Sequence, residues 1–314
     1  MKVEAKAGPD PRREISELVT LRDALRYAVS AFSAAGLYYG HGSTTALDEA
    51  VFLILESLNL PVEDFNAFAD ARLTAREKAL IGERIAQRIE TRQPAAYIIG
   101  RTYLAGVPFR SDARALVPRS FIGELLASSL FNGSGEAGAL VEDPMEIASV
   151  LDLCTGGGSL AILAAYAFPN AEIDAVDLSA DALTLAAENV EDHGFGDRIK
   201  LLRGDLFGPL AGRTYDLIIT NPPYVGQDVM AVLPPEFTHE PAMALDGGAD
   251  GFDIVHRILA QSASHLNPGG GLLCEIGTDS DILESQYPHT PFLWLDTEHS
   301  EGEVFWLRRE QLPQ

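Results

Sequence analysis

Four consecutive residues, Asn221-Pro222-Pro223-Tyr224, have side chains and spacing suited to chemistry on a planar nitrogen. They follow an apolar run, residues 215–220, of the kind that forms a buried strand. The two prolines restrict the backbone beyond the strand, so the Pro222 carbonyl is held in place. The Asn221 side-chain oxygen is a second acceptor, and Tyr224 offers a flat face for packing. Together they can accept both hydrogens of an NH₂ group; the alternative is an ordinary Pro-Pro loop.

A glycine-rich segment, residues 152–158, precedes this motif and reads Asp-Leu-Cys-Thr-Gly-Gly-Gly. Glycines without a Cβ let the backbone pass close to a ligand. Asp177 follows at the end of the next apolar run, where a carboxylate can accept both hydroxyls of a ribose. Gly156, Gly158 and Ala161 also match the dinucleotide pattern G-x-G-x-x-A, and a glycine turn without chemical role is a further alternative.

The acidic residue before the glycines, Asp152, favours one ligand class over the other. In a dinucleotide site this region faces an anionic pyrophosphate, which a carboxylate would repel. S-adenosylmethionine has no phosphate and carries a sulfonium and an ammonium group, which a carboxylate attracts. Asp205, in Arg203-Gly204-Asp205, ends the third apolar run and could serve the exocyclic amine of an adenine. The alternative for Asp205 is a surface turn.

The elements that must position these residues alternate from residue 148 onward between strand, loop and helix. This alternation predicts an α/β, Rossmann-like domain with a parallel sheet, helices on both faces, and ligands at the carboxyl ends of the strands. The predicted strands are residues 149–153, 171–176, 199–202, 217–220, 271–276 and 304–307, and the predicted helices are residues 160–168, 180–191 and 252–266.

The first third of the chain is predicted to form a small helical bundle. Apolar residues recur at helical spacing in three segments, and Thr74 with Glu77 forms a capping box before the third, which Pro94 ends. The buried faces are predicted to contain Leu25, Ala28, Val29 and Phe32; Leu47, Ala50, Val51 and Ile54; and Ile81, Ile85 and Ile89.

Between these parts, residues 97–117 alternate around Gly100 and Gly106 and predict a β-hairpin, followed by a short helix, residues 121–130. Residues 132–144 predict a flexible loop. We therefore expect three parts: residues 1–95, a helical domain; residues 96–146, the hairpin, helix and linker; and residues 147–314, the Rossmann-like domain.

Composition restricts the class of protein further. The net charge of −23 disfavours tight binding to nucleic acid and suits either simple solubility or a basic partner. No run of about 18 apolar residues and no signal peptide are found, and Cys154 and Cys274 are expected to be free thiols. These features predict a cytoplasmic protein without membrane or DNA binding and without a metal site.

The motifs resemble the HemK-like protein glutamine N(5)-methyltransferases over nearly the whole chain. Several segments are most similar to the PrmB branch, which methylates a glutamine of large-subunit ribosomal protein L-three. These segments are Tyr39-Gly40-His41-Gly42, Asp48-Glu49-Ala50, residues 93–97, residues 116–124, and His239-Glu240-Pro241 through Gly247, Gly248, Asp250 and Gly251. Phe121 departs from the proline associated with that branch.

The resemblance implies a role for each motif residue. Asn221, Pro222, Pro223 and Tyr224 would bind the substrate amide, with Asn221 and Pro222 catalytic. The cofactor S-adenosylmethionine would be bound by Asp152, Thr155, Gly156, Gly157, Gly158, Asp177, Asp205, Leu206 and Asn221. The helical domain, residues 1–95, would help to recognise the substrate protein. The partner would be a basic protein, free ribosomal protein L-three or an assembly intermediate.

Four polar residues are not assigned to this chemistry. Arg119 and Glu124 are interpreted as an ordinary surface or helix-end charge pair, and His41 as a turn histidine without ligands nearby. His239 belongs either to a lid or to a surface loop.

Three functions remain in competition. The first is transfer of a methyl group to a protein glutamine, with a release factor as the alternative substrate. The second is methylation of adenine in nucleic acid, because the same four residues suit its exocyclic amine. The third is a cofactor-binding scaffold without activity.

Overall fold

The computed structural model describes residues 10–133 and 138–313. The chain divides into two compact units, a helical unit of residues 1–101 and 234–239 and a second unit of residues 102–233 and 240–314. The division into three parts predicted from the sequence, with boundaries at residues 95 and 146, stays a prediction. The predicted loop 132–144 lies partly outside the described residues.

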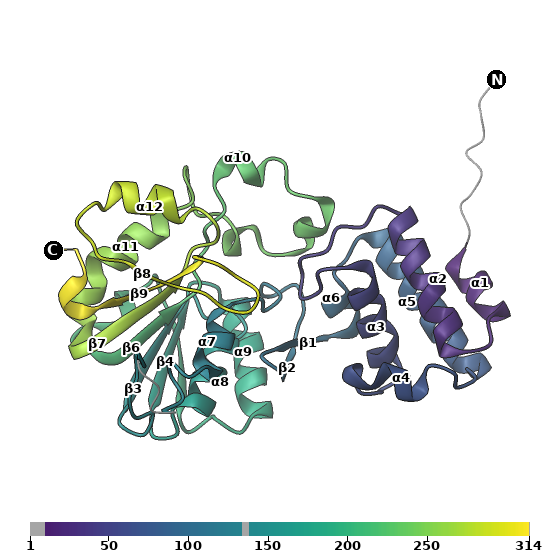
Figure 1. Cartoon of the computed structure of the whole chain (residues 1–314), viewed down its shortest axis with the longest axis horizontal. Helices are drawn as coiled ribbons and strands as arrows, with labels where there is room; N and C mark the ends of the chain where they lie inside the picture. Colours follow the sequence, from purple (N-terminus) through teal and green to yellow (C-terminus); the bar gives the residue numbers. More distant parts are fainter. Residues whose placement is uncertain (1–9, 134–137, 314) are drawn as a thin grey trace. The chain divides into compact units, whose positions relative to one another are not determined.

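The helical unit is formed by short amphipathic helices that pack their apolar sides together (Figure 1). The capping box predicted at Thr74 is confirmed: Glu77 N–H donates to Thr74 Oγ1 at 3.3 Å, and Thr74 N–H donates to Glu77 Oε2 at 2.7 Å. The helices are α1 (Pro11–Glu17), α2 (Leu21–Ala34), α3 (Ala46–Ser57), α4 (Phe65–Phe68), α5 (Ala75–Thr91) and α6 (Ala95–Ile99).

The prediction that Leu47 lies in the core of this unit is wrong. Leu47 is 51% exposed, because the buried face of α3 runs through Ala50, Leu53 and Ile54 and leaves Leu47 at its edge. The three helices were correctly predicted, but the helical periodicity of apolar residues did not fix which side of α3 faces the core.

Buried charges also lie inside the helical unit, and they are paired. Arg88 Nε donates to Glu49 Oε1 at 2.7 Å, and both side chains are almost completely buried. Glu236, from the segment 234–239, accepts from Arg92 Nη1 and from the Tyr38 N–H, each at 3.0 Å. This segment is therefore fixed within the helical unit by a buried carboxylate, although it is distant in sequence.

The predicted hairpin is shorter than expected. The structure has β1 (Arg101–Leu104) and β2 (Val107–Arg110), joined by Ala105 and Gly106, both with positive φ. Residues 97–99, predicted to lie in the hairpin, instead end α6 (Ala95–Ile99), which follows Pro94, and residues 111–117 form no strand. Helix α7 (Ile122–Ala127) lies within the predicted helix at residues 121–130.

The second unit has the Rossmann-like α/β fold that the sequence predicted. Its sheet has the strand order β5-β4-β3-β6-β7-β9-β8, and β3 to β7 are parallel. The strands are β3 (Ser149–Leu153), β4 (Glu172–Asp177), β5 (Ile199–Arg203), β6 (Tyr215–Thr220), β7 (Leu266–Glu275), β8 (Leu293–Leu295) and β9 (Val304–Arg308). Its main helices are α8 (Ser159–Ala167), α9 (Ala180–Asp192), α10 (Gln227–Met230), α11 (Asp253–Ser262) and α12 (Ser280–Gln286).

The expectation of a wholly parallel sheet is wrong at one edge. β9 pairs antiparallel with both β7 and β8. The short strand β8 was not predicted, because only three residues form it and the turn before it contains two prolines.

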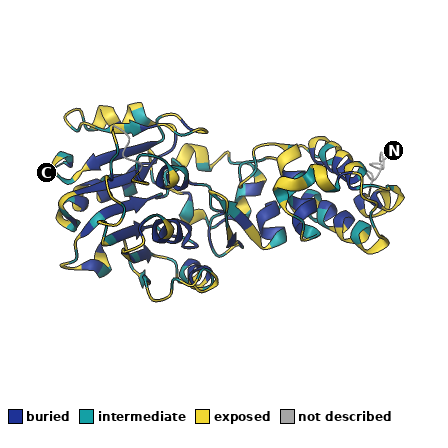
Figure 2. Cartoon of the chain, turned by 60° about the horizontal axis from the view of Figure 1, so that its bottom comes forward, coloured by how far each residue is buried: buried dark blue, intermediate teal, exposed yellow. Residues whose placement is uncertain are grey.

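Helices cover both faces of this sheet, as predicted. One apolar core joins α7, α8 and α9 to alternate strand residues such as Val150, Ile173 and Leu217. The other joins α11 and α12 to the intervening residues, such as Leu151 and Ile218. The central strands are therefore buried on both sides, as the dark strands of Figure 2 show. Among the described residues, no helix has the length and apolar character needed to cross a membrane.

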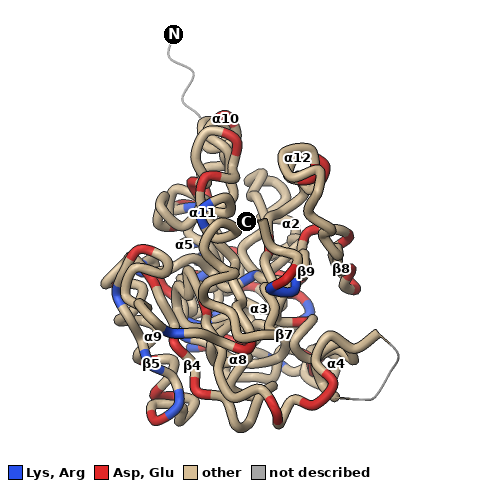
Figure 3. Tube along the Cα trace, turned by 90° about the vertical axis from the view of Figure 1, so that its left-hand side faces the viewer, with Lys and Arg blue, Asp and Glu red and all other residues tan. Residues whose placement is uncertain are grey.

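The charge of the protein is unevenly divided. The helical unit carries 13 Lys and Arg against 15 Asp and Glu, whereas the second unit carries 10 against 31. Figure 3 shows acidic residues along α10 and α12, where no Lys or Arg is present. The acidic excess is thus a property of the unit that contains the sheet.

Candidate functional site

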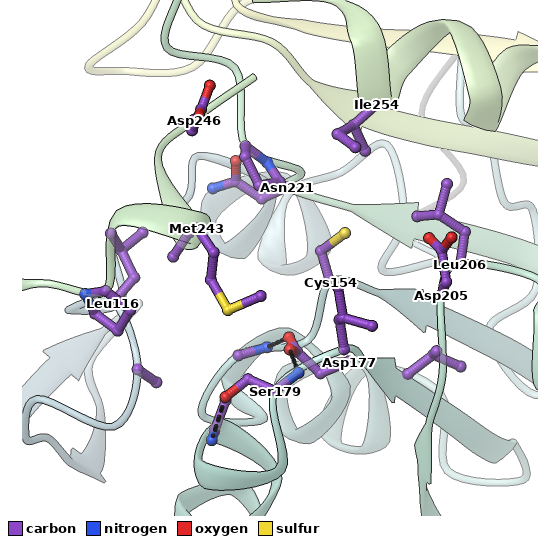
Figure 4. Close-up of a pocket in the computed structure, with 18 of the residues that line it drawn as sticks. Leu116, Cys154, Asp177, Ser179, Asp205, Leu206, Asn221, Met243, Asp246 and Ile254 are labelled. Carbon is purple, nitrogen blue, oxygen red and sulfur yellow. Dashed lines mark hydrogen bonds between the residues drawn. The ribbon is translucent and has the colours of Figure 1, made fainter. Parts of the chain in front are cut away.

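A cavity of about 290 Å³ lies at the carboxyl ends of β3, β4, β5 and β6 (Figure 4). β3 is the point at which the strand order reverses, because β4 lies on one side of it and β6 on the other. Open α/β sheets bind ligands at this kind of position. Six of the predicted site residues line the cavity: Gly156, Asp177, Asp205, Leu206, Asn221 and Pro223.

The glycine-rich loop approaches the cavity through Gly156. Gly156 has φ +54°, and a Cβ added there would meet no atom within 4 Å. Gly158, with φ +82°, instead packs against Ala186 of α9, where a Cβ would lie 3.1 Å from the Ala186 Cβ. The glycines therefore have different functions: Gly156 leaves open space, and Gly158 allows the turn into α8 to approach α9.

Asp152 lies beneath this loop and does not line the cavity. Its Oδ2 accepts from Thr155 Oγ1 at 2.5 Å and from the Ala161 N–H at 3.0 Å, so it fixes the loop and the start of α8. Its Oδ1 is buried and has no hydrogen-bond partner among the described residues. Burial raises the pKa of Asp152 to about 7.

Asp177 ends β4 and faces the cavity. Its Oδ2 accepts from the Gly156 N–H at 2.8 Å, and its Oδ1 accepts from the Ser179 N–H at 2.8 Å. Each carboxylate oxygen keeps lone-pair capacity for a second donor. Burial raises the pKa of Asp177 although these bonds oppose the shift. The carboxylate is thus oriented by backbone groups on both sides.

Asp205 and Leu206 follow β5 on the same edge of the cavity. Asp205 is more than half exposed and accepts from Arg257 Nη2 at 2.7 Å. Leu206 is nearly buried and has φ +47°. The surface turn considered for Asp205 is therefore present, and its carboxylate also reaches the cavity lining.

Asn221 follows β6 directly. Its side-chain Nδ2 donates to Glu275 Oε1 at 2.9 Å, which leaves Oδ1 available on the other side of the amide. Figure 4 shows Asn221 above Cys154 and beside Asp246 at the cavity. The amide oxygen that the sequence singled out is therefore held on a fixed side chain.

Pro222, Tyr224, Thr155, Gly157 and Gly158 do not line the cavity. Tyr224 packs among glycines that have no room for a side chain. A Cβ at Gly247 would lie 2.8 Å from Tyr224 Cα, and one at Gly277 would lie 3.0 Å from the Tyr224 ring. The glycines quoted for the resemblance thus include residues that fix the backbone of the Asn-Pro-Pro-Tyr motif.

Sequence reasoning missed several residues of this site. Cys154, Arg114, Met243 and Ile254 line the cavity, and Glu275 with Ser120 lies behind Asn221. A carboxylate at the end of the otherwise apolar strand 271–275 was the available signal for Glu275. Cys154 and Cys274 are free thiols, as expected.

The four unassigned polar residues are now placed. Arg119 is more than a surface charge, because its Nη1 and Nη2 each donate to buried Glu240 at 2.7 Å. Glu124 Oε1 accepts from exposed His299 Nδ1 at 2.9 Å. His41 is buried, with its ring centroid 4.4 Å from that of Phe237. His239 Nε2 donates to the Thr91 carbonyl at 2.8 Å. No group of possible metal ligands occurs among the described residues.

Comparison with known proteins gives consistent matches. The family model of the methyltransferase small domain matches residues 138–249. Over 94% of its length the chain is 55% identical to the ribosomal protein uL3 glutamine methyltransferase of Bradyrhizobium diazoefficiens, of which it covers 92%. It is 48% identical, also over 94% of its length, to the proteins of the same name from Bordetella pertussis and Neisseria gonorrhoeae, of which it covers 97% and 96%.

Proposed function

We propose that this chain, which belongs to the family of ribosomal protein uL3 glutamine methyltransferases, methylates the side-chain amide nitrogen of a glutamine in uL3 with S-adenosylmethionine as the methyl donor. One observation carries the chemical part of the proposal. Asn221 lines the same cavity as Asp177 and Gly156, with its amide held by Glu275. A methyl donor and an amide nitrogen can therefore be bound side by side.

The residues around the cavity fit S-adenosylmethionine. Asp177 is oriented by two backbone N–H groups and can accept from ribose hydroxyls. Gly156 leaves open space for close approach, and Leu178, Leu206 and Ile254 provide apolar walls for an adenine ring. In its ionised form Asp152, whose Oδ1 has no hydrogen-bond partner among the described residues, adds negative potential beneath the loop, which favours a cationic ligand over a phosphate. Bound S-adenosylmethionine supplies a methyl group on positively charged sulfur.

The protein has to activate a weak nucleophile, because the lone pair of an amide nitrogen is delocalised into the carbonyl. Asn221 Oδ1 and the Pro222 carbonyl can accept the two hydrogens of the substrate NH₂. They then oppose the positive charge that develops on nitrogen during attack and draw the nitrogen out of conjugation. Fixing the nitrogen in line with the methyl group supplies a large effective molarity. The proton leaves to solvent afterwards.

The uneven charge supports a basic protein as the substrate. The unit that contains the cavity carries 31 acidic and 10 basic residues, and such a surface repels nucleic acid phosphates. It attracts a basic ribosomal protein before that protein is covered by RNA. We therefore propose free uL3 or an early assembly intermediate as the substrate and the cytoplasm as the place of reaction.

The test is incubation of the protein with radiolabelled S-adenosylmethionine and four separate substrates: free uL3, mature large ribosomal subunits, total ribosomal RNA and a release factor. We expect label on a glutamine of free uL3. The initial rate should fall as salt rises, because the Debye length shrinks from about 10 Å at 0.1 M to about 3 Å at 1 M.

Other outcomes lead to different functions. Label in RNA would support adenine methylation, and preferential label in the release factor would move the substrate to the alternative branch. Efficient labelling of mature subunits without a salt effect would contradict the role of charge. Binding of NAD but not of S-adenosylmethionine would overturn the whole proposal.

A further inference from the structure

We infer that Glu275 is a positioning residue for methyl transfer, which holds the Asn221 amide with its oxygen toward the substrate, and that Ser120 holds Glu275. This inference rests on the function proposed for Asn221. Neither residue touches the cavity itself, so each acts through another group.

Strand register places Glu275 beside Asn221. Thr220 and Cys274 are partners in the parallel pairing of β6 with β7, so Asn221 and Glu275 each come one residue later, at the same edge of the sheet. Glu275 Oε1 accepts from Asn221 Nδ2 at 2.9 Å. Its Oε2 accepts from Ser120 Oγ at 2.6 Å and from the Phe121 N–H at 2.9 Å. All the partners are therefore donors directed at one completely buried carboxylate.

The chemistry of a carboxylate determines which way the Asn221 amide faces. An ionised carboxylate only accepts hydrogen bonds, so it must meet the NH₂ end of the amide. The oxygen end then remains for the substrate NH₂. If the amide were turned over, its own NH₂ would face the substrate NH₂, and two donors cannot hydrogen-bond to each other. Glu275 thus selects the orientation that the reaction needs.

Protonation of Glu275 would remove this selection. A carboxylic acid carries an O–H that can donate to Asn221 Oδ1, which stabilises the turned amide. Burial raises the pKa of Glu275 to about 7, and Ser120 and Phe121 oppose the shift. The other charged or titratable neighbours include Glu303, whose negative charge raises the pKa of Glu275 further. Burial raises the pKa of the Tyr224 phenol and of the Cys274 thiol, so both stay neutral beside it. The fraction of correctly oriented Asn221 should consequently increase as pH rises through about 7.

Glu275→Gln is the informative variant because it preserves size. The Phe121 N–H can only donate, so it retains the Gln oxygen, and the Gln NH₂ then faces position 221. Asn221 must present its oxygen to that NH₂ and its own NH₂ to the substrate. We expect turnover to fall about 10- to 100-fold, with the affinity for S-adenosylmethionine unchanged, as calorimetry would show for a folded variant.

A double-mutant cycle with Asn221→Ala separates positioning from an independent role. If Glu275 acts through Asn221, the double variant should turn over as slowly as Asn221→Ala alone. The pH profile of turnover gives a second readout. The wild type should lose activity about tenfold per pH unit below an apparent pKa near 7. Glu275→Gln should lack this acid limb of the pH profile.

Glu303→Gln is the matched control, since it removes a nearby carboxylate that does not contact Asn221. It should keep the limb and move it to lower pH. Normal turnover of Glu275→Gln beside a slow Asn221→Ala would overturn the inference and leave the proposed function intact. Multiplicative losses in the double variant would also overturn it. Normal turnover of Asn221→Ala would instead contradict the proposed function.

Discussion

The two units of this protein differ in how they bury charge. The buried carboxylates Glu49 and Glu236 of the helical unit are paired with arginines, whereas the methyltransferase unit has one buried carboxylate paired in this way, Glu240 with Arg119, and two that are not. In the helical unit, buried Glu49 lies 2.7 Å from buried Arg88, and Glu236 lies 3.0 Å from Arg92. In the methyltransferase unit, Asp152 and Glu275 are buried with no Lys or Arg in an ion pair among the described residues, and the pKa of each is raised to about 7. The hydrogen-bond partners of these two carboxylates are neutral donors.

The difference distinguishes buried ion pairs, which stabilise structure, from buried carboxylates without an ion-pair partner, which can act on a ligand or a catalytic group. A buried ion pair cancels its own field, so it fixes geometry and has little influence beyond its partners. An uncompensated carboxylate is costly, and it persists only where its field or its acceptor oxygens are used. Asp152 and Glu275 both lie beside the candidate site, as this reasoning requires.

The largest expected effect comes from breaking the helical pair. Arg88→Met leaves Glu49 and Glu236 buried without this partner and should lower the free energy of unfolding by about 3–5 kcal/mol. Far-UV circular dichroism would detect the loss of the helices. Tryptophan fluorescence should change later, because Trp294 and Trp306 both lie in the methyltransferase unit. The exposed ion pairs of Arg12 provide the control, and Arg12→Met should have a much smaller effect. If Arg88→Met abolished cofactor binding while the helices stayed folded, the comparison would fail.

Removal of the substrate acceptor should affect rate rather than stability. Asn221→Ala is expected to lower turnover by about 10²–10³, as for other groups aimed at developing charge. Steady-state kinetics with free uL3 would measure it. Cofactor affinity from calorimetry should hardly change, since the amide faces the other substrate. A variant that lost both equally would indicate a disturbed cavity rather than a lost acceptor.

The unpaired carboxylates should make the methyltransferase unit less stable as pH rises. The native pKa of Glu275 is raised to about 7, above its value in an unfolded chain. At a pH between the unfolded and the native pKa, Glu275 is deprotonated in the unfolded chain but still protonated in the native protein. The stability contributed by Glu275 is therefore present at low pH and is lost as pH rises through about 7. The upper limit is about 3 kcal/mol at 1.36 kcal/mol per pKa unit.

Glu275→Gln removes this pH dependence. Urea unfolding followed by tryptophan fluorescence at pH 5 and pH 8 should show the variant gaining on the wild type as pH rises, although its turnover is lower. Equal differences at both pH values would mean that Glu275 is compensated in a way that the described contacts do not include.

A smaller effect is expected at the cofactor carboxylate. Asp177→Ala should weaken S-adenosylmethionine binding by about 1.5–3 kcal/mol, the scale of a lost charge-assisted hydrogen bond. Asp205→Ala should cost less, because Asp205 is more than half exposed and already paired with Arg257. Calorimetry on both variants would rank them, and the reverse order would exchange their assignments.

Much of the fold was predictable because local pattern and chain order agreed. The parallel strands, the helices on both faces and the capping box at Thr74 all follow from periodicity and short motifs. The antiparallel edge was not predictable, since β8 has three residues and its pairing with β9 is a tertiary effect. The exposure of Leu47 depends in the same way on what covers one side of a helix.

Residues of the candidate site were predictable where they belong to local sequence motifs. They were not predictable where only tertiary contacts bring them to the site. Gly156, Asp177 and Asn221 belong to motifs with recognisable spacing, and they line one cavity. Glu275 and Ser120 are 155 positions apart, and only the sheet brings them together behind Asn221. Their contact depends on strand register, which no local pattern records.

The segment 234–239 has a consequence for synthesis of the chain. The helical unit includes it, yet residues 102–233 are made between Arg101 and Pro234. At about 5–20 residues per second, ribosomes need roughly 7–26 s to make this stretch. During that time Arg92 lacks Glu236, and the Tyr38 N–H lacks its acceptor. The first unit to emerge therefore cannot be finished first, and a fragment ending near residue 101 should resist protease less well than the same helices in the whole protein.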